Sequence, residues 1–492
     1  MDQNLERAHR IAAFVSTLFI LILFGYILYK AYQVEKNERE SKRKLAQRYD
    51  RVKLAEREDQ AREDDMTTLI DHPVYEFEET RVEETSDLEE LPAGCTYDQL
   101  KTLVKDNEWI SSYRQTLEKS FELKLTKYSK LLNEAYLEEE KVVTRATPQG
   151  GPQVEIARIK TLVTSLEEVV EALRVRLGDL SDDVIRRDFT QLFHHPTFGL
   201  ETLVGRLEFK NFIADRIYAF SRSPEIFFGT FQNTVVLGES GIGKTKLAQC
   251  LAYSYGKSGM LAHYKFKQIT KKDLTNSFVN GSAAMAYNLL ASMFEGVIYH
   301  DEAYNLSPTN VYGPGTRDHG DEATTEIVNF LDQYRGMQVY VASGYEKEMR
   351  EGFLGANEGM ARRFPHVITL TQFSASELTT ILIRCIHERT QIVLDKTEGN
   401  ILYTLISEAL KKNPKAFPTQ GGDMFNMAAT ISQVMIATPH LEWVPKSPRN
   451  LKLLQIGFRK FMKEKDSSKK APKVPPTNDL LKVLSQMTKV QQ

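Results

Sequence analysis

The stretch Gly238–Thr245 constrains the fold of this chain more than any other. Its sequence, Gly-Glu-Ser-Gly-Ile-Gly-Lys-Thr, fits the pattern G-x-x-x-x-G-K-[ST]. It follows the short apolar run 234–237 and precedes a helical pattern that begins at Lys246. Glycines let successive backbone N–H groups turn inward around phosphate oxygens, and the following helix adds the positive end of its dipole. The stretch therefore predicts a phosphate-binding loop between a strand and a helix.

The loop also predicts which side chains handle a nucleotide. Lys244 is expected to reach the β- and γ-phosphates of ATP, and the Thr245 hydroxyl is expected to bind Mg²⁺. The alternative is a glycine-rich turn that matches by chance, and a second motif argues against it. The expected nucleotide-binding residues of this segment are Gly238, Glu239, Ser240, Gly241, Ile242, Gly243, Lys244, Thr245 and Lys246.

The second motif is a pair of carboxylates at the end of a predicted strand. The short apolar run after Gly296 ends in Asp301 and Glu302, as expected of a buried strand that delivers acids to its carboxyl end. Asp301 is expected to hold Mg²⁺ through the water shell of the ion, and Glu302 to orient and activate the attacking water. The two motifs predict Mg²⁺-dependent hydrolysis of ATP, with Glu302 and Lys244 as catalytic residues.

Length and composition set the limits. A chain of 492 residues is too long for one ordinary domain, so two or three folded units with linkers are expected. Its three cysteines, Cys95, Cys250 and Cys385, have neither metal-ligand spacing nor a disulfide pattern, which favours packing roles in a reducing compartment. A net charge of -2 does not indicate a nucleic-acid partner. The motif region also lacks the basic stripe with interleaved aromatic residues that is typical of nucleic-acid binding.

The N-terminal part predicts a membrane anchor. The run Ile11–Tyr29 contains no charged residue and is long enough to span a bilayer as one helix. A cleaved signal peptide is the alternative, but no small-residue cleavage site follows. Residues 30–53 hold nine Lys or Arg against four acids, so the positive-inside rule places the C-terminal part on the cytoplasmic or matrix side. Residues 1–10 would then form a short extracytoplasmic end.

A charged tether and a helical domain are expected next. Residues 30–96 form the tether, and within it 56–90 hold fifteen acids against three arginines, which cannot bury a core. Residues 97–190 have helical periodicity. The second half of this domain suits a helical hairpin or a short coiled coil, within one chain or between subunits. Its apolar stripe is Ile159, Leu162, Leu166, Val169, Leu173 and Leu177.

The motif region predicts an α/β fold followed by helices. Short apolar strands alternate with helical patterns, which implies a parallel sheet covered on both faces. Ser374 and Glu377 fit a capping box at the start of a helical lid that spans 373–463. A flexible tail, 464–492, with a short helix at 479–490 would follow. The expected strands are 225–228, 234–237, 265–269, 297–299 and 338–342.

These motifs together resemble an AAA+ ATPase module. The resemblance covers about 203–429 and is greatest to the CbxX/CfqX family, which includes red-type Rubisco activase and stage V sporulation protein K. It implies an α/β P-loop NTPase domain with a parallel sheet at 199–372 and a C-terminal helical lid. The segments that carry it are 203–205, 238–245, 273–274 with 278–279, 301–304, 318–323, 342–345 and 357–364.

The resemblance also implies site residues. Arg362 and Arg363 lie where such proteins keep arginine fingers that reach the γ-phosphate of a neighbouring subunit, with Arg363 the first choice. Val204 and Gly205 would join the nucleotide site, and Ser343 is the candidate sensor of the γ-phosphate. The lid segment 420–426 has no arginine of the kind that red-type activases use to read the nucleotide.

An arginine finger that acts on a neighbour implies a ring, most often a homohexamer. Phe278 and Val279 would then lie in a pore loop that grips an unfolded polypeptide. The expected function is a membrane-anchored AAA+ ATPase that remodels or unfolds a protein substrate near the membrane. The alternative is a nucleotide-gated membrane scaffold with slow ATP turnover, and nucleic-acid translocation is a third, less favoured reading.

Overall fold

The computed structural model describes residues 94–145, 153–276, 281–306, 320–355, 357, 359–437 and 447–470, all within one compact unit. Several predicted features lie outside these residues: the membrane segment Ile11–Tyr29, the tether up to 93, the pore residues Phe278 and Val279, and the C-terminal helix. Among the described residues, none of the helices combines the length and the apolar character needed to cross a bilayer.

The N-terminal described part is helical, as predicted. It consists of α2 (Tyr97–Leu103), α3 (Asn107–Arg145), α4 (Gln153–Gly178) and α5 (Asp182–His194). The predicted apolar stripe of α4 is buried except for Leu177, which is half-buried. The stripe packs against α3 and against α10 (Gly281–Ala291) of the same chain. The two long helices therefore form a hairpin within one chain, and they share one hydrophobic core with the sheet region.

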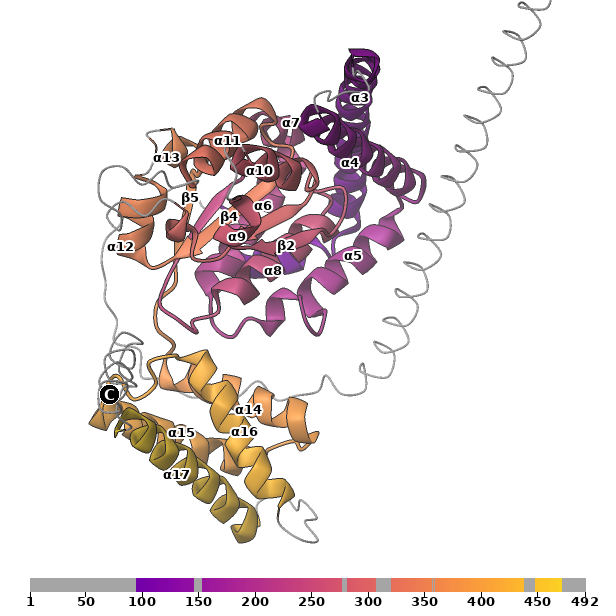
Figure 1. Ribbon diagram of the computed structural model, residues 1–492. Coiled ribbons are helices and arrows are strands. Elements are labelled where there is room, and N and C mark those ends of the chain that lie inside the picture. Colours follow the sequence, from indigo (N-terminus) through magenta and orange to yellow (C-terminus); the bar gives the residue numbers. More distant parts are fainter. Residues whose placement is uncertain are drawn as a thin grey trace, which may run out of the picture. The chain divides into compact units, whose positions relative to one another are not determined.

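A five-stranded parallel sheet organises the central part. Its strands are β1 (Thr234–Leu237), β2 (Phe266–Ile269), β3 (Val297–His300), β4 (Val339–Gly344) and β5 (His366–Thr369), in the order β2-β3-β4-β1-β5. The three inner strands are entirely buried, because helices cover both faces. Helices α10 and α11 (Gly320–Gln333) lie on one side and α8 (Lys244–Lys257) on the other (Figure 1).

The remaining elements connect the strands and correct one prediction. Residues 225–228 were expected to form a strand but belong to helix α7 (Pro224–Gly229). Pro224 begins this helix with a fixed φ, and the buried Phe227 packs edge-on against Phe220 at 5.4 Å. The other elements are η1 (Leu200–Thr202), α6 (Leu207–Arg222), α9 (Lys271–Leu274), η2 (Ala303–Asn305), α12 (Glu346–Glu348), η3 (Met349–Phe353) and α13 (Met360–Arg363).

The C-terminal helices form the predicted lid around a separate hydrophobic core. They are α14 (Ala375–Thr390), α15 (Lys396–Lys412), α16 (Gly421–Ile436) and α17 (Pro448–Lys470). The capping box is confirmed, because Ser374 Oγ accepts from the Glu377 amide at 3.3 Å and the Glu377 carboxylate accepts from the Ser374 amide at 2.7 Å. Helix α17 continues into the segment expected as a tail, where Lys465 pairs with Asp423 of α16 at 2.6 Å.

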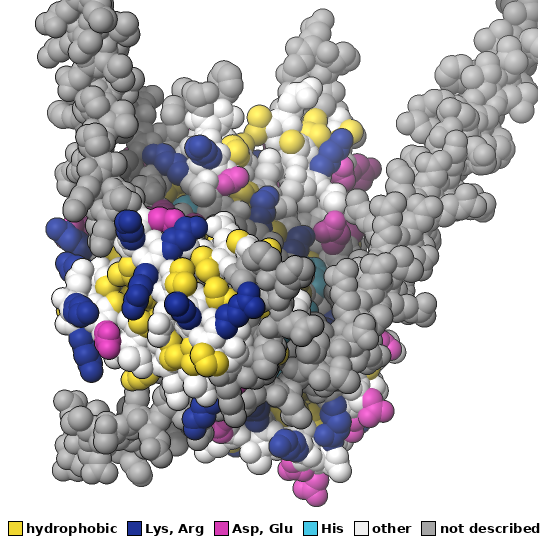
Figure 2. Space-filling view, turned by 90° about the horizontal axis from the view of Figure 1, so that it is seen from below, with side chains coloured by type: hydrophobic (Ala, Val, Ile, Leu, Met, Phe, Trp, Pro, Cys, Tyr) yellow, Lys and Arg dark blue, Asp and Glu magenta, His cyan; other side chains and the backbone are white. Residues whose placement is uncertain are grey.

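The solvent side of α17 is basic. Its buried side includes Phe458 and Phe461, while Ile456 is an exposed apolar residue. Figure 2 shows a face of the molecule on which Lys and Arg side chains are spread among hydrophobic ones. Such a surface attracts acidic partners at long range, but the described part of α17 exposes no aromatic ring on which a base could stack. The exposed basic residues of this helix are Arg449, Lys452, Arg459, Lys460 and Lys463.

Candidate active site

The predicted phosphate loop connects β1 to α8 at the carboxyl end of the sheet. Gly241 and Gly243 have φ values of 71° and 96°, in the left-handed region that favours glycine. A Cβ atom on Gly241 would also lie only 2.0 Å from the Thr419 carbonyl oxygen of the lid. Ile242 is buried, whereas Glu239 and Ser240 are exposed. The loop thus has the backbone freedom and the solvent access that phosphate binding requires.

Lys244 lies directly at this loop. Its side chain is buried, and Nζ donates hydrogen bonds to the carbonyl oxygens of Gly238 at 2.9 Å and Glu239 at 3.0 Å. These partners are neutral, so the ammonium charge is not cancelled by them and can interact with phosphate oxygens. The side chain of Lys246, for which nucleotide binding stays a prediction, donates to the Thr197 carbonyl oxygen.

Three of the predicted residues meet around one hydroxyl group, that of Tyr299 on β3. Thr245 Oγ1 donates to Tyr299 Oη at 3.2 Å, and Ser343 Oγ of β4 donates to the same oxygen at 2.8 Å. Tyr299 Oη in turn donates to Asp301 Oδ1 at 3.1 Å. Asp301 also accepts from Ser343 at 3.2 Å and, through Oδ2, from Gln268 of β2 at 3.3 Å. The carboxyl ends of three adjacent strands therefore hold this carboxylate.

The second carboxylate, Glu302, has the properties of a general base. Its backbone is in the left-handed region at φ 52°, which turns the chain sharply after the strand. Tyr304 Oη donates a hydrogen bond to its carboxylate. Partial burial raises the pKa of Glu302, and the nearby Lys244 ammonium acts in the opposite direction. A carboxylate with a raised pKa accepts a proton from water more readily.

These donors fit Mg²⁺ bound with ATP. Hydroxyl and carboxylate oxygens are the ligands that Mg²⁺ prefers, and the ion usually keeps several waters while it takes one or two protein groups and phosphate oxygens. Thr245 and Asp301 supply such oxygens next to the phosphate loop. In the part of the chain that the structure describes, no group of three His, Cys, Asp or Glu side chains could hold a metal by itself.

The lid touches the phosphate loop directly. The Gly421 amide at the start of α16 donates to the Gly241 carbonyl oxygen at 3.1 Å. Arg206 donates to the Ile242 carbonyl oxygen at 3.1 Å and to the Thr371 carbonyl oxygen at 2.8 Å, beside the start of the lid. A Cβ atom on the predicted site residue Gly205 would overlap the Glu377 carboxylate of α14. The predicted site residue Gly205 and its neighbour Arg206 thus lie where the segment before α6 meets the phosphate loop and the lid.

The two arginines of α13 differ in their surroundings. Arg363, the first choice for an arginine finger, forms an ion pair with Asp332 of α11. It also donates to the carbonyl oxygens of Gly359 and, at 3.3 Å, Val328. Arg362 is exposed, and no hydrogen bond or ion pair joins it to any described residue. Arg363 is therefore engaged within its own chain, and Arg362 is the one available to a neighbour.

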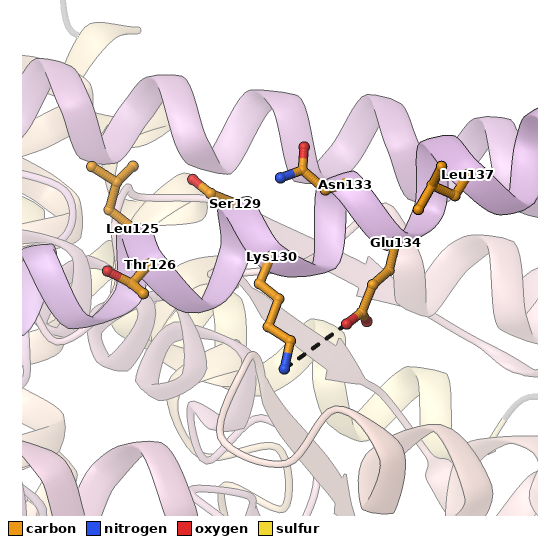
Figure 3. A pocket seen from close by; sticks show the side chains of 7 residues that line it. All are labelled: Leu125, Thr126, Ser129, Lys130, Asn133, Glu134 and Leu137. Carbon is orange, nitrogen blue, oxygen red and sulfur yellow. Dashed lines mark ion pairs between the residues drawn. The ribbon is translucent and has the colours of Figure 1, made fainter.

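A separate open hollow lies away from these residues. It has a volume of about 550 Å³ and runs along α3, where Lys130 and Glu134 face each other (Figure 3). None of the predicted nucleotide-binding residues lines it, and every lining residue comes from one helix. A hollow with one wall offers no enclosure for a nucleotide. Its lining residues are Leu125, Thr126, Ser129, Lys130, Asn133, Glu134 and Leu137.

Sequence reasoning missed Tyr299, Tyr304 and Arg206. Tyr299 stands two residues before Asp301, and side chains at that spacing on a strand point to the same face. This periodicity could have placed its hydroxyl next to Asp301. Arg206 follows the predicted segment 203–205 directly, but no sequence pattern indicates that it reaches both the loop and the lid junction.

Comparison with known proteins agrees with this geometry. Residues 234–365 match the family described as ATPase family associated with various cellular activities, or AAA. The chain is 28% identical over 177 residues to the ESX-3 secretion system protein EccA3 of Mycolicibacterium smegmatis, which covers 36% of this chain and 28% of that protein. It is 26% identical over 180 residues to stage V sporulation protein K of Bacillus subtilis, covering 37% and 54% of the two chains.

A third relative is a cfxQ-like protein of Acanthamoeba polyphaga mimivirus, 23% identical over 261 residues, with 51% of this chain and 61% of that protein covered. The chain thus spans less than two thirds of the length of each of these relatives. The family match covers strands β1 to β4 with the phosphate loop and the acidic pair, the part of the chain to which the chemistry is assigned. This chain therefore contains an ATPase domain of the AAA family and is similar to the stage V sporulation protein K and cfxQ-like group.

Proposed function

We propose that this protein is a Mg²⁺-dependent ATPase that works as a ring with shared active sites and uses the energy to remodel a protein substrate. The observation that carries the proposal is the contrast on α13, where Arg363 is held by Asp332 while Arg362 is exposed and has no described partner. An exposed arginine that no described residue of its own chain engages suits insertion into the ATPase site of a neighbour. We therefore assign the arginine finger to Arg362.

Each residue of the site has a separate role in ATP hydrolysis. Thr245 and Asp301 would hold Mg²⁺, which would supply positive charge to offset the charge of the phosphates. Glu302 accepts a proton from the attacking water, whose oxygen forms a bond to the γ-phosphorus as the bond to the β-γ bridging oxygen breaks. Lys244 and the neighbour's Arg362 stabilise the charge that develops on the phosphate oxygens. Arg363 holds α13 in place through Asp332 and so positions its neighbour Arg362.

Mixing two inactive variants of the full-length chain tests the shared site. Lys244→Ala and Arg362→Ala should each lose about three orders of magnitude or more in turnover, because each removes a charge that stabilises the transition state. An equal mixture should recover up to about a quarter of wild-type activity, since that share of interfaces pairs an intact loop with an intact arginine. ATPase rate is measured against total protein concentration, and the specific activity of wild type should rise with concentration.

The opposite pattern would change the function. If the mixture stays inactive and wild-type activity is independent of concentration, each site works alone. The protein would then be better described as a nucleotide-controlled scaffold with slow turnover. Arg363→Ala in place of Arg362→Ala serves as the comparison. We expect Arg363→Ala to lower the melting temperature, because it breaks the contact between α13 and α11, whereas Arg362→Ala should leave the melting temperature unchanged.

A membrane anchor is the second part of the proposal. It is supported by the charge-free run Ile11–Tyr29 and by the basic residues that follow it. Cells that produce the full-length chain should retain it in the membrane after alkaline carbonate extraction. Leu18→Arg/Leu21→Arg should release it, since each arginine at a helix centre costs roughly 2.5–3.5 kcal/mol of insertion free energy. Leu18→Ala/Leu21→Ala is the control, and release of wild type by carbonate would exclude the anchor.

A further inference from the structure

The hydroxyl of Tyr299 occupies a position that the general chemistry of ATP hydrolysis does not require. The side chain is completely buried, and its ring stacks on Phe266 at 6.1 Å. Packing alone would be satisfied by a phenyl ring. The hydroxyl nevertheless makes three hydrogen bonds, to Thr245, Ser343 and Asp301, at 3.2, 2.8 and 3.1 Å. Two of these partners are the residues assigned to the metal.

The direction of these bonds matters for metal binding. A phenol has one hydrogen to donate, and an ionised carboxylate can only accept, so the Tyr299 hydrogen points to Asp301. The Thr245 hydroxyl must then donate to Tyr299 Oη, while the single hydrogen of Ser343 is shared between Tyr299 Oη and Asp301 Oδ1. A threonine hydroxyl that has given its hydrogen away keeps its lone pairs for a cation.

We propose that Tyr299 is a positioning residue of the Mg²⁺ site, whose hydroxyl passes the hydrogen bond of Thr245 on to Asp301 and links both to Ser343 on β4. The inference rests on the proposed ATPase function and deepens it. It also gives Ser343 a role, because this residue holds the same tyrosine and carboxylate from the neighbouring strand. A displacement of Ser343 at the end of β4 would therefore alter the positions of both Thr245 and Asp301 through the Tyr299 hydroxyl.

The test measures binding of a fluorescent ATP analogue to the full-length protein, with excess EDTA and over a Mg²⁺ titration. Tyr299→Phe should raise the half-saturating Mg²⁺ concentration about tenfold, the lower end of what the loss of an outer-shell partner costs. Its affinity for the analogue in EDTA should stay within about twofold of wild type, because the phosphate loop is unchanged. Ser343→Ala should shift the Mg²⁺ curve in the same direction by a smaller factor.

Tyr340→Phe is the matched control. Tyr340 is an equally buried tyrosine on β4, and its hydroxyl bonds to His300 at 2.8 Å and not to the metal ligands. The proposal fails if the Tyr299→Phe curve coincides with that of wild type, or if Tyr340→Phe shifts the curve as far. Should Tyr299→Phe not fold, an unshifted curve for Ser343→Ala contradicts the proposal equally. Wild type that binds the analogue in neither condition would overturn the ATPase function itself, which separates the two failures.

Discussion

Glu302→Gln should reduce ATP turnover roughly 10²–10⁴-fold while leaving ATP bound. Glutamine keeps the size and the hydrogen-bonding groups of the side chain but cannot accept a proton from water. Nucleotide binding depends on the loop and Lys244, which the substitution does not touch. Steady-state ATPase assays give the loss of turnover, and a fluorescent ATP analogue gives the affinity. Retention of more than about a tenth of wild-type turnover would show that Glu302 is not the base.

Glu348→Gln provides the control for this variant. Glu348 is an exposed carboxylate on α12 that helps to raise the pKa of Glu302. Its loss should leave maximal turnover almost unchanged. Because Glu302 acts in its deprotonated form, activity falls as the pH drops through its pKa. Removal of the Glu348 charge lowers that pKa, so the acidic limb of the pH profile should move slightly to lower pH.

Glu295→Ala should lower the free energy of unfolding by about 3–5 kcal/mol. Glu295 lies just before β3, and its carboxylate pairs with Lys124 of α3 at 2.5 Å, with side chains exposed by only 1% and 3%. It also accepts from Tyr128 Oη at 2.7 Å and from the Ala262 amide at 2.9 Å. Without it the Lys124 ammonium is buried and keeps, among the described residues, the Met260 carbonyl oxygen as a hydrogen-bond partner and the Phe228 ring as a cation-π contact. Denaturant unfolding monitored by circular dichroism measures the loss.

An exposed ion pair gives the contrast. Lys101 and Glu201 also lie 2.5 Å apart, but both side chains are more than a third exposed. Lys101→Ala should therefore cost at most about 1 kcal/mol. The double variant Lys124→Met/Glu295→Gln should recover much of the lost stability, because it leaves no uncompensated buried charge. Equal losses for the buried and the exposed pair would contradict this account of how α3 is attached.

The residues whose type and spacing are required for phosphate and Mg²⁺ binding could be predicted from the sequence. The residue spacing of the phosphate loop allows one backbone geometry, so the positions of Lys244 and Thr245 could be predicted from the sequence. The strand that precedes Asp301 and Glu302 could be predicted as well. The error at α7 has a different cause. Ile226, Phe227 and Phe228 form an apolar run too short for any period to show, so the sequence did not distinguish helix from strand.

Contacts between distant segments were not predictable from one sequence. Lys124 and Glu295 are 171 positions apart, and each taken alone is indistinguishable from a surface charge. The same holds for Arg363 and Asp332, so the sequence could not decide which arginine of the pair is already engaged. Tyr299 was predicted only as the end of the strand 297–299, and the bonds of its hydroxyl did not follow from the sequence.

The hydrogen bond from the Gly421 amide to the Gly241 carbonyl oxygen connects the lid to the phosphate loop. Since the four lid helices have a hydrophobic core of their own, they can turn as one body about the junction near Thr371 and Arg206. We therefore expect a shift of the loop backbone on nucleotide binding to be accompanied by a rotation of the whole lid. In the proposed ring, such a rotation would connect the nucleotide state of one subunit to the position of the next.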